Sequence, residues 1–95
     1  MIVQRKSFQL MEPGHPKAEF CVDPAGLLEV DCSDGQRCYM AEFNSLQFRP
    51  NEQGTLLVCK SRPGWQLQLR DCDAQRLKWM VEIARDEFGA LMRDL

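Results

Sequence analysis

Apolar and polar residues alternate with a period of two over most of the first seventy residues, which is typical of strands that bury one face. The clearest case is residues 65–70, where Trp65, Leu67 and Leu69 alternate with glutamine and arginine. Residues 55–60 are apolar on both faces and predict a central strand. Runs of proline, glycine and aspartate separate these segments and predict turns. The predicted strands are residues 2–10, 18–22, 28–32, 37–43, 46–49, 55–60 and 65–70.

The last third of the chain has a helical period instead. Residues 73–94 place apolar side chains three and four positions apart, and Asp71 or Asp73 precedes them as a capping carboxylate. The main apolar stripe is formed by Leu77, Val81, Ala84, Phe88, Leu91, Met92 and Leu95, with Met80 at its edge. We therefore expect a single α+β domain, residues 1–95. In it, a curved antiparallel sheet of about five to seven strands, a meander of short hairpins, packs its apolar face on one long C-terminal helix.

The third and fourth predicted strands form a hairpin whose register follows from its faces. Val30 and Cys32 alternate with acidic residues. The pairing that keeps one face apolar therefore sets Val30 opposite Met40 and Cys32 opposite Cys38, through an odd-length loop with a glycine bulge. A two-residue loop would pair Val30 with Tyr39 and mix the faces. We expect the first register.

The predicted helix carries a second apolar feature on the side opposite its main stripe. Trp79 and Ile83 lie one turn apart there, and Arg76 is close to them. Because tryptophan and arginine are over-represented at binding hot spots, we predict that these three residues bind another protein or a second copy of this chain. The alternative is that the N-terminal residues or residues 41–50 bury this side, since small domains rarely leave large apolar patches uncovered.

A strand pair followed by a helix with this tryptophan and aliphatic spacing resembles the end of a pleckstrin-homology domain. Trp79 and Ile83 match the spacing, and the predicted strands match in number. The resemblance covers about the last forty residues. It implies a pleckstrin-homology-like roll as an alternative fold. Members that bind phosphoinositides carry clustered basic residues between the first strands, whereas that loop here holds Lys17 alone, so lipid binding is not expected.

Composition narrows the function classes. The chain has 44% hydrophobic and 27% charged residues, as soluble globular proteins do, and its net charge is −2. Nucleic-acid-binding domains are usually basic, so no nucleic-acid partner is expected. The first residues lack the apolar core of a signal peptide, and the longest apolar run, residues 56–59, is too short to cross a membrane. We expect a soluble cytoplasmic protein with no membrane partner.

Chemistry-bearing residues are few. No two cysteines form a C-x-x-C pair, so neither a zinc site nor a disulfide framework is expected. Four of the five lie in predicted strands, where we expect buried thiols. His15 is the only histidine, and no local signature pairs it with a nucleophile. We therefore expect no catalytic residue, no metal and no cofactor. The cysteines are Cys21, Cys32, Cys38, Cys59 and Cys72.

Two functional hypotheses remain. The favoured one is a small non-enzymatic protein-interaction module, of which a homodimer through Trp79 and Ile83 is one form. The alternative is a small ligand-binding or catalytic domain with a site near Cys59 and Met80 on the helix. A weaker feature is a polar strand face, interpreted as a solvated exterior or as a docking face for an acidic segment. It would consist of Gln66, Gln68, Arg70, Gln47 and Arg49.

Overall fold

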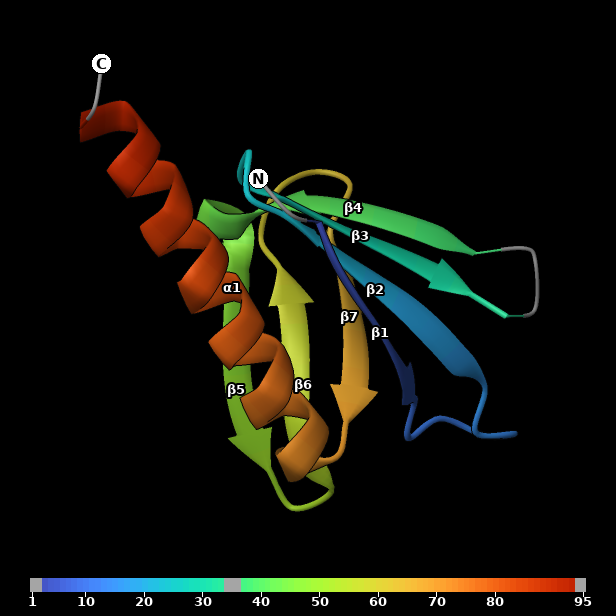
Figure 1. Cartoon of the computed structure of the whole chain (residues 1–95). Coiled ribbons are helices and arrows are strands. Elements are labelled where there is room, and N and C mark those ends of the chain that lie inside the picture. The colour runs from blue at the N-terminus through green and yellow to red at the C-terminus, as the bar shows by residue number, and fades with distance from the viewer. Residues whose placement is uncertain (1–2, 34–36, 94–95) are drawn as a thin grey trace.

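In the part of the chain that the structure describes, seven strands are followed by one long helix, and Figure 1 shows their arrangement. The computed structural model describes residues 3–33 and 37–93, the last seven of these as backbone only. The strands form two antiparallel sheets, with the orders β1-β2-β3-β4 and β5-β6-β7. In chain order the elements are β1 (Gln4–Gln9), β2 (Lys17–Asp23), β3 (Leu27–Cys32), β4 (Cys38–Glu42), the 3-10 turn η1 (Phe43–Ser45), β5 (Leu46–Asn51), β6 (Gly54–Cys59), β7 (Trp65–Leu69) and α1 (Asp71–Arg93).

The predicted α+β fold, with antiparallel strands and a C-terminal helix, is confirmed. The strands divide into two sheets because η1 ends the first meander and β5 pairs with β6 alone. β6 is central in its sheet, as its two apolar faces predicted. The order of seven strands and a terminal helix agrees with the roll that the pleckstrin-homology resemblance implies.

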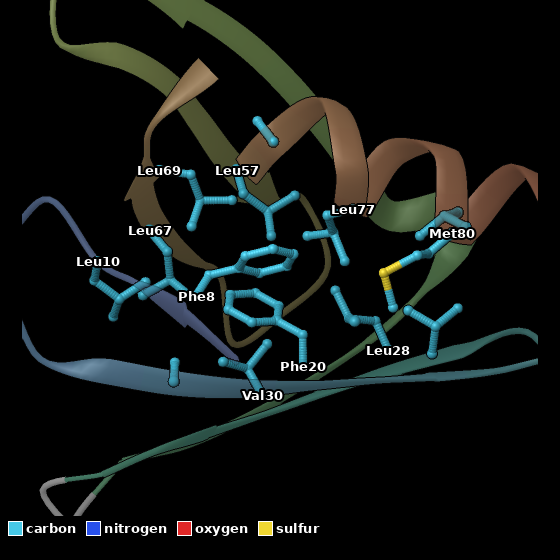
Figure 2. Packing of buried hydrophobic residues seen from close by; sticks show 14 of the residues in the cluster. Phe8, Leu10, Phe20, Leu28, Val30, Leu57, Leu67, Leu69, Leu77 and Met80 are labelled. Atoms are coloured by element: carbon cyan, nitrogen blue, oxygen red, sulfur yellow. The ribbon is translucent and has the colours of Figure 1, made fainter. Parts of the chain in front are cut away.

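The core lies between the two sheets and α1. Figure 2 shows the rings of Phe8 and Phe20 at its centre, with centroids 5.4 Å apart. The first sheet adds Leu28 and Val30, and the second adds Leu57, Leu67 and Leu69. Each such side chain contributes about 1.5–3 kcal/mol by leaving water. The predicted inward set, Leu28, Val30, Leu67 and Leu69, is buried throughout.

α1 closes the core with the stripe that its sequence predicted. Leu77, Met80, Val81 and Ala84 are all buried, and the helix contacts β2, β5 and β6. The structure does not describe the side chains of Phe88, Leu91 and Met92, and Leu95 lies outside the described residues. Figure 1 shows that the C-terminal end of the helix extends past both sheets.

The first turn of α1 is held by two carboxylates. The Thr55 hydroxyl donates to Asp71 at 2.7 Å, and the Arg70 guanidinium donates to Asp73 at 3.0 Å. The positive end of the helix dipole also favours acidic residues at this position. These contacts tie the start of the helix to β6 and to the end of β7.

The register of β3 against β4 differs from the predicted one. Val30 lies opposite Tyr39, so the predicted pairing with Met40 is wrong. The predicted pairing of Cys32 with Cys38 is wrong as well, because Cys38 lies opposite Asp31. Cys32 is buried and Cys38 is exposed. The two thiols therefore belong to opposite faces of the sheet.

The physical reason for this error is that β4 has two faces of similar hydrophobicity. Tyr39 and Ala41 form the inner face, and the Tyr39 ring packs on Trp65 with centroids 5.2 Å apart. Met40 lies on the outer face and is 59% exposed. An aromatic ring buries more apolar area than a thioether and stacks on a second ring, so the inner position goes to Tyr39. The odd-length loop predicted between β3 and β4 contains residues 34–36, which lie outside the described residues.

Candidate functional site

The three predicted interaction residues lie on the side of α1 away from the core. Trp79 is 58% exposed, Arg76 is exposed, and Ile83 is half-buried one turn further along. The alternative, in which the chain's own N-terminal residues or residues 41–50 bury this side, therefore does not hold for Trp79. Residues 41–50 supply β5, which contacts the helix.

A groove of about 250 Å³ runs between β1 and this side of the helix. We call it the β1–α1 groove. β1 lines it with Gln4, Arg5 and Lys6, and α1 lines it with Arg76, Trp79 and Met80. Three of these side chains are cationic and none is a carboxylate. The thioether of Met80, which also belongs to the core, supplies an apolar floor.

The polarity of β1 explains why the groove stays open. Gln4, Lys6 and Phe8 are paired with Val22, Phe20 and Ala18, so they share the inward face of the strand. Of these three only Phe8 is buried. A lysine at an inward position keeps its ammonium in water, and the strand therefore cannot close on the helix there. In the sequence, this feature is visible as a lysine at a position of residues 2–10 where the alternation calls for an apolar residue. The sequence did not show which side of the helix would lie opposite that lysine.

Among the other hollows that border α1, two are larger than the β1–α1 groove but less well suited to a charged ligand. The larger, about 480 Å³, lies between the β2–β3 turn, η1 and Arg85. Arg85 already donates to the carbonyl oxygen of Phe43 at 2.9 Å and lies over that ring. The other, about 270 Å³, lies between β5 and the helix and has both signs of charge, from Lys78, Arg85 and Glu82.

The cysteines divide by position. Cys32 and Cys59 are buried as predicted, whereas Cys38 is exposed, so the expectation of a buried thiol is wrong for Cys38. Cys72, which lies outside the predicted strands, is exposed as well. Cys21 is half-buried, and its pKa is raised above the ordinary thiol value, mainly by burial. Among the described residues, no group of three or more histidine, cysteine, aspartate or glutamate side chains could hold a metal ion.

No hollow described above contains both Cys59 and Met80, the two residues of the alternative site. Met80 lines the β1–α1 groove, but Cys59 does not, nor does it line the other hollows named above. The Cys59 thiol contacts the backbone oxygen of Ser61 at 3.9 Å. The alternative site therefore stays a prediction.

The predicted polar strand face is largely engaged within the chain. Gln47 and Gln66 flank Val58 on the outer face of the second sheet, as predicted. Gln68 is buried and exchanges two hydrogen bonds with Asn51, at 2.8 and 3.1 Å. The remaining members, Arg49 and Arg70, bind Gln47 and Asp73.

No family model matches this chain, and no curated protein or solved structure matches it either. The pleckstrin-homology resemblance accordingly concerns the order of the elements alone. Within the described ranges, no helix has the length and apolar character needed to span a membrane. The geometry and charge of the β1–α1 groove make it the candidate functional site.

Proposed function

We propose that this chain is a non-enzymatic protein-interaction module that binds an acidic segment of a partner protein in the β1–α1 groove. The observation that carries the proposal is an exposed tryptophan among three cations. Trp79 offers apolar area, while Arg5, Lys6 and Arg76 offer charge-assisted hydrogen bonds to carboxylates. Tryptophan and arginine together are the side chains most enriched at hot spots. The module is proposed to act in the cytoplasm, where its free thiols stay reduced.

Charge favours an acidic partner over a homodimer through the same groove. A two-fold contact sets one patch against its own copy, which would bring Arg5, Lys6 and Arg76 toward the same three residues of the second copy. Bringing these cations together at an interface makes the free energy of binding less favourable, whereas carboxylates placed opposite them make it more favourable. Self-association through Trp79 and Ile83 is accordingly the second form of the hypothesis, and the experiment below distinguishes it.

The remaining charge of the molecule opposes a polyanion such as nucleic acid or an anionic membrane. The outer face of the first sheet carries Glu19, Glu29, Asp31 and Glu42. With a net charge of −2, the whole molecule repels a long polyanion while a short acidic segment fits the local cations.

Paired charge reversals on the same helix test the proposal. The probe is a seven-residue peptide in which glutamate and leucine alternate, with binding measured by titration calorimetry. We expect Arg76→Glu and Trp79→Ala each to weaken binding by about tenfold or more. Lys78→Glu makes the same change in net charge on the β5 side of the helix and should bind as the wild type does.

Equal losses from Arg76→Glu and Lys78→Glu would mean that only overall charge matters, and the proposed site would be wrong. The same holds if neither substitution has an effect. Thermal unfolding of each variant confirms that the fold is intact. A dimer in light scattering that Trp79→Ala dissociates would replace the acidic partner with a second copy of this chain.

A further inference from the structure

We infer that the partner segment binds as an extended strand that pairs with the free edge of β1. This inference rests on the proposed function and adds the backbone to the side-chain contacts described above. Three observations support it. They are which residues of β1 direct their backbone groups away from β2, how the other sheet edges are blocked, and which charges flank the free edge.

β1 is an edge strand whose outward backbone groups can be identified. Its only neighbour in the first sheet is β2. The Leu10 N–H donates to the Pro16 carbonyl at 2.8 Å in the same register that pairs Phe8 with Ala18. Hydrogen-bonded and non-hydrogen-bonded pairs alternate along an antiparallel ladder. The even-numbered residues of β1 therefore bond to β2, and the odd-numbered ones direct their N–H and C=O groups to the free side.

Met11, the next odd-numbered residue, makes a backbone hydrogen bond on the free side of the chain. Its N–H donates to the carbonyl oxygen of Gln68 in β7 at 2.8 Å. Before Met11, no hydrogen bond of the described residues takes up the backbone groups of Arg5, Ser7 or Gln9. Three consecutive outward residues are thus available to a partner, and β7 limits the pairing at Met11.

The other sheet edges are less open than that of β1. The outward carbonyl of Met40 in β4 accepts a hydrogen bond from the Trp65 indole at 3.2 Å. β5 contains Pro50, which has no N–H to donate, and such residues blunt an edge against pairing. The outward carbonyl of Gln68 in β7 is the one that Met11 occupies. β1 contains no proline, so it can donate as well as accept along its length.

The side chains around the free edge select an acidic strand. Side chains of an added strand would alternate between the two faces of the extended sheet. On the inward face they would meet Lys6 together with Arg76 and Trp79 of α1, and on the outward face they would meet Arg5. Carboxylates of the added strand would be attracted to these cations on either face, and an apolar side chain on the inward face would pack on Trp79. The same cations disfavour the edge-to-edge pairing of two β1 strands, because it would oppose like charges.

N-methylated peptides test the backbone pairing separately from the side chains. Two versions of the glutamate–leucine peptide are made, one methylated at every glutamate amide and the other at every leucine amide. An added strand turns only one set of amides toward β1, so we expect one version to lose binding by about tenfold or more and the other to keep it. Equal affinities of both versions, or equal losses, would overturn strand pairing.

Ser7→Pro tests the same pairing from the side of the protein. The Ser7 N–H points to the free side, so proline removes an outward donor without removing a bond to β2. We expect Ser7→Pro to weaken peptide binding by about tenfold, and Ser7→Ala, which keeps the N–H, to leave it unchanged. Circular dichroism reports the fold of both variants.

The outcomes separate the two proposals. If Arg76→Glu and Trp79→Ala weaken binding but both methylated peptides bind as the parent does, the interaction module stands and the strand geometry is wrong. If the parent peptide does not bind, the proposed function is wrong and the strand geometry falls with it. Tighter binding of an oligothymidylate or of phosphatidylserine vesicles than of the peptide would also overturn both.

Discussion

Cys21 illustrates how a single residue takes its properties from the face on which it lies. It is half-buried on the outer face of the first sheet, opposite Arg5 on one side and Glu29 on the other. Burial raises its pKa most, Arg5 lowers it, and the carboxylates of Glu19 and Glu29 raise it again. The net direction is upward, which stabilises the protonated thiol over the reactive thiolate.

Alkylation of Cys21 should therefore require a higher pH in the folded protein than in the unfolded one. Below its raised pKa the thiol stays protonated, so its rate of reaction with iodoacetamide rises only as the pH passes that value. Peptide mass spectrometry measures the rate at this residue across pH, with and without urea. Glu19→Gln removes one raising carboxylate and should move the profile back toward lower pH. A folded profile at or below the unfolded one would contradict this prediction.

At the scale of the elements, β6 lies against the backbone of β7 at Gly54. This residue begins β6 with φ +136°, which only glycine adopts without strain. A Cβ at this position would overlap the backbone carbonyl oxygen of Leu69 in β7. Gly26, in the turn before β3, also has a positive φ, of +106°, but has open space where a Cβ would lie. An alanine at either position would therefore strain the backbone, but only at Gly54 would its Cβ also overlap another atom.

Gly54→Ala should destabilise the fold more than Gly26→Ala does. Strain at a positive φ costs about 1 kcal/mol at either position. Overlap with a backbone atom that has no alternative rotamer brings the loss at Gly54→Ala to about 3 kcal/mol. Urea unfolding followed by circular dichroism measures both free energies. Equal losses in the two variants would show that β7 moves aside at no cost.

At the scale of the whole molecule, charge is divided between two surfaces. The β1–α1 groove carries cations, whereas the outer face of the first sheet carries Glu29, Asp31 and Glu42. The net charge of −2 is a sum over the whole chain, so it does not reveal this division. Attraction between the exposed groove and an acidic segment acts through water, so dissolved ions screen it over about 10 Å at 0.1 M salt.

Binding of the glutamate–leucine peptide should therefore weaken as sodium chloride is raised. Between 50 and 500 mM we expect a loss of affinity of about tenfold, measured by calorimetry. Arg76→Glu should flatten this dependence, because it removes one of the cations that the salt screens. An affinity that does not change with salt would mean that Trp79 and Met80 bind the peptide without the charges, and the acidic character of the partner would be contradicted.

Local patterns determined most of the fold. All seven strands and the helix were predicted to within about two residues at each end, because periods of two and of 3.6 are properties of neighbouring residues. The inward residues of β3, β7 and α1 followed for the same reason. The helical period also placed Trp79 and Ile83 opposite the main stripe, with Arg76 close to them, but it left open whether the rest of the chain buries that side.

Only the tertiary structure decided how the elements meet. The sequence allowed two registers for β4, and packing of Tyr39 on Trp65 chose between them. It placed Lys6 in a strand, but the groove exists because that strand lies beside Arg76 and Trp79. Such contacts join residues seventy positions apart. They depend on all the packing interactions in the folded chain together, and a pattern of neighbouring residues cannot predict these.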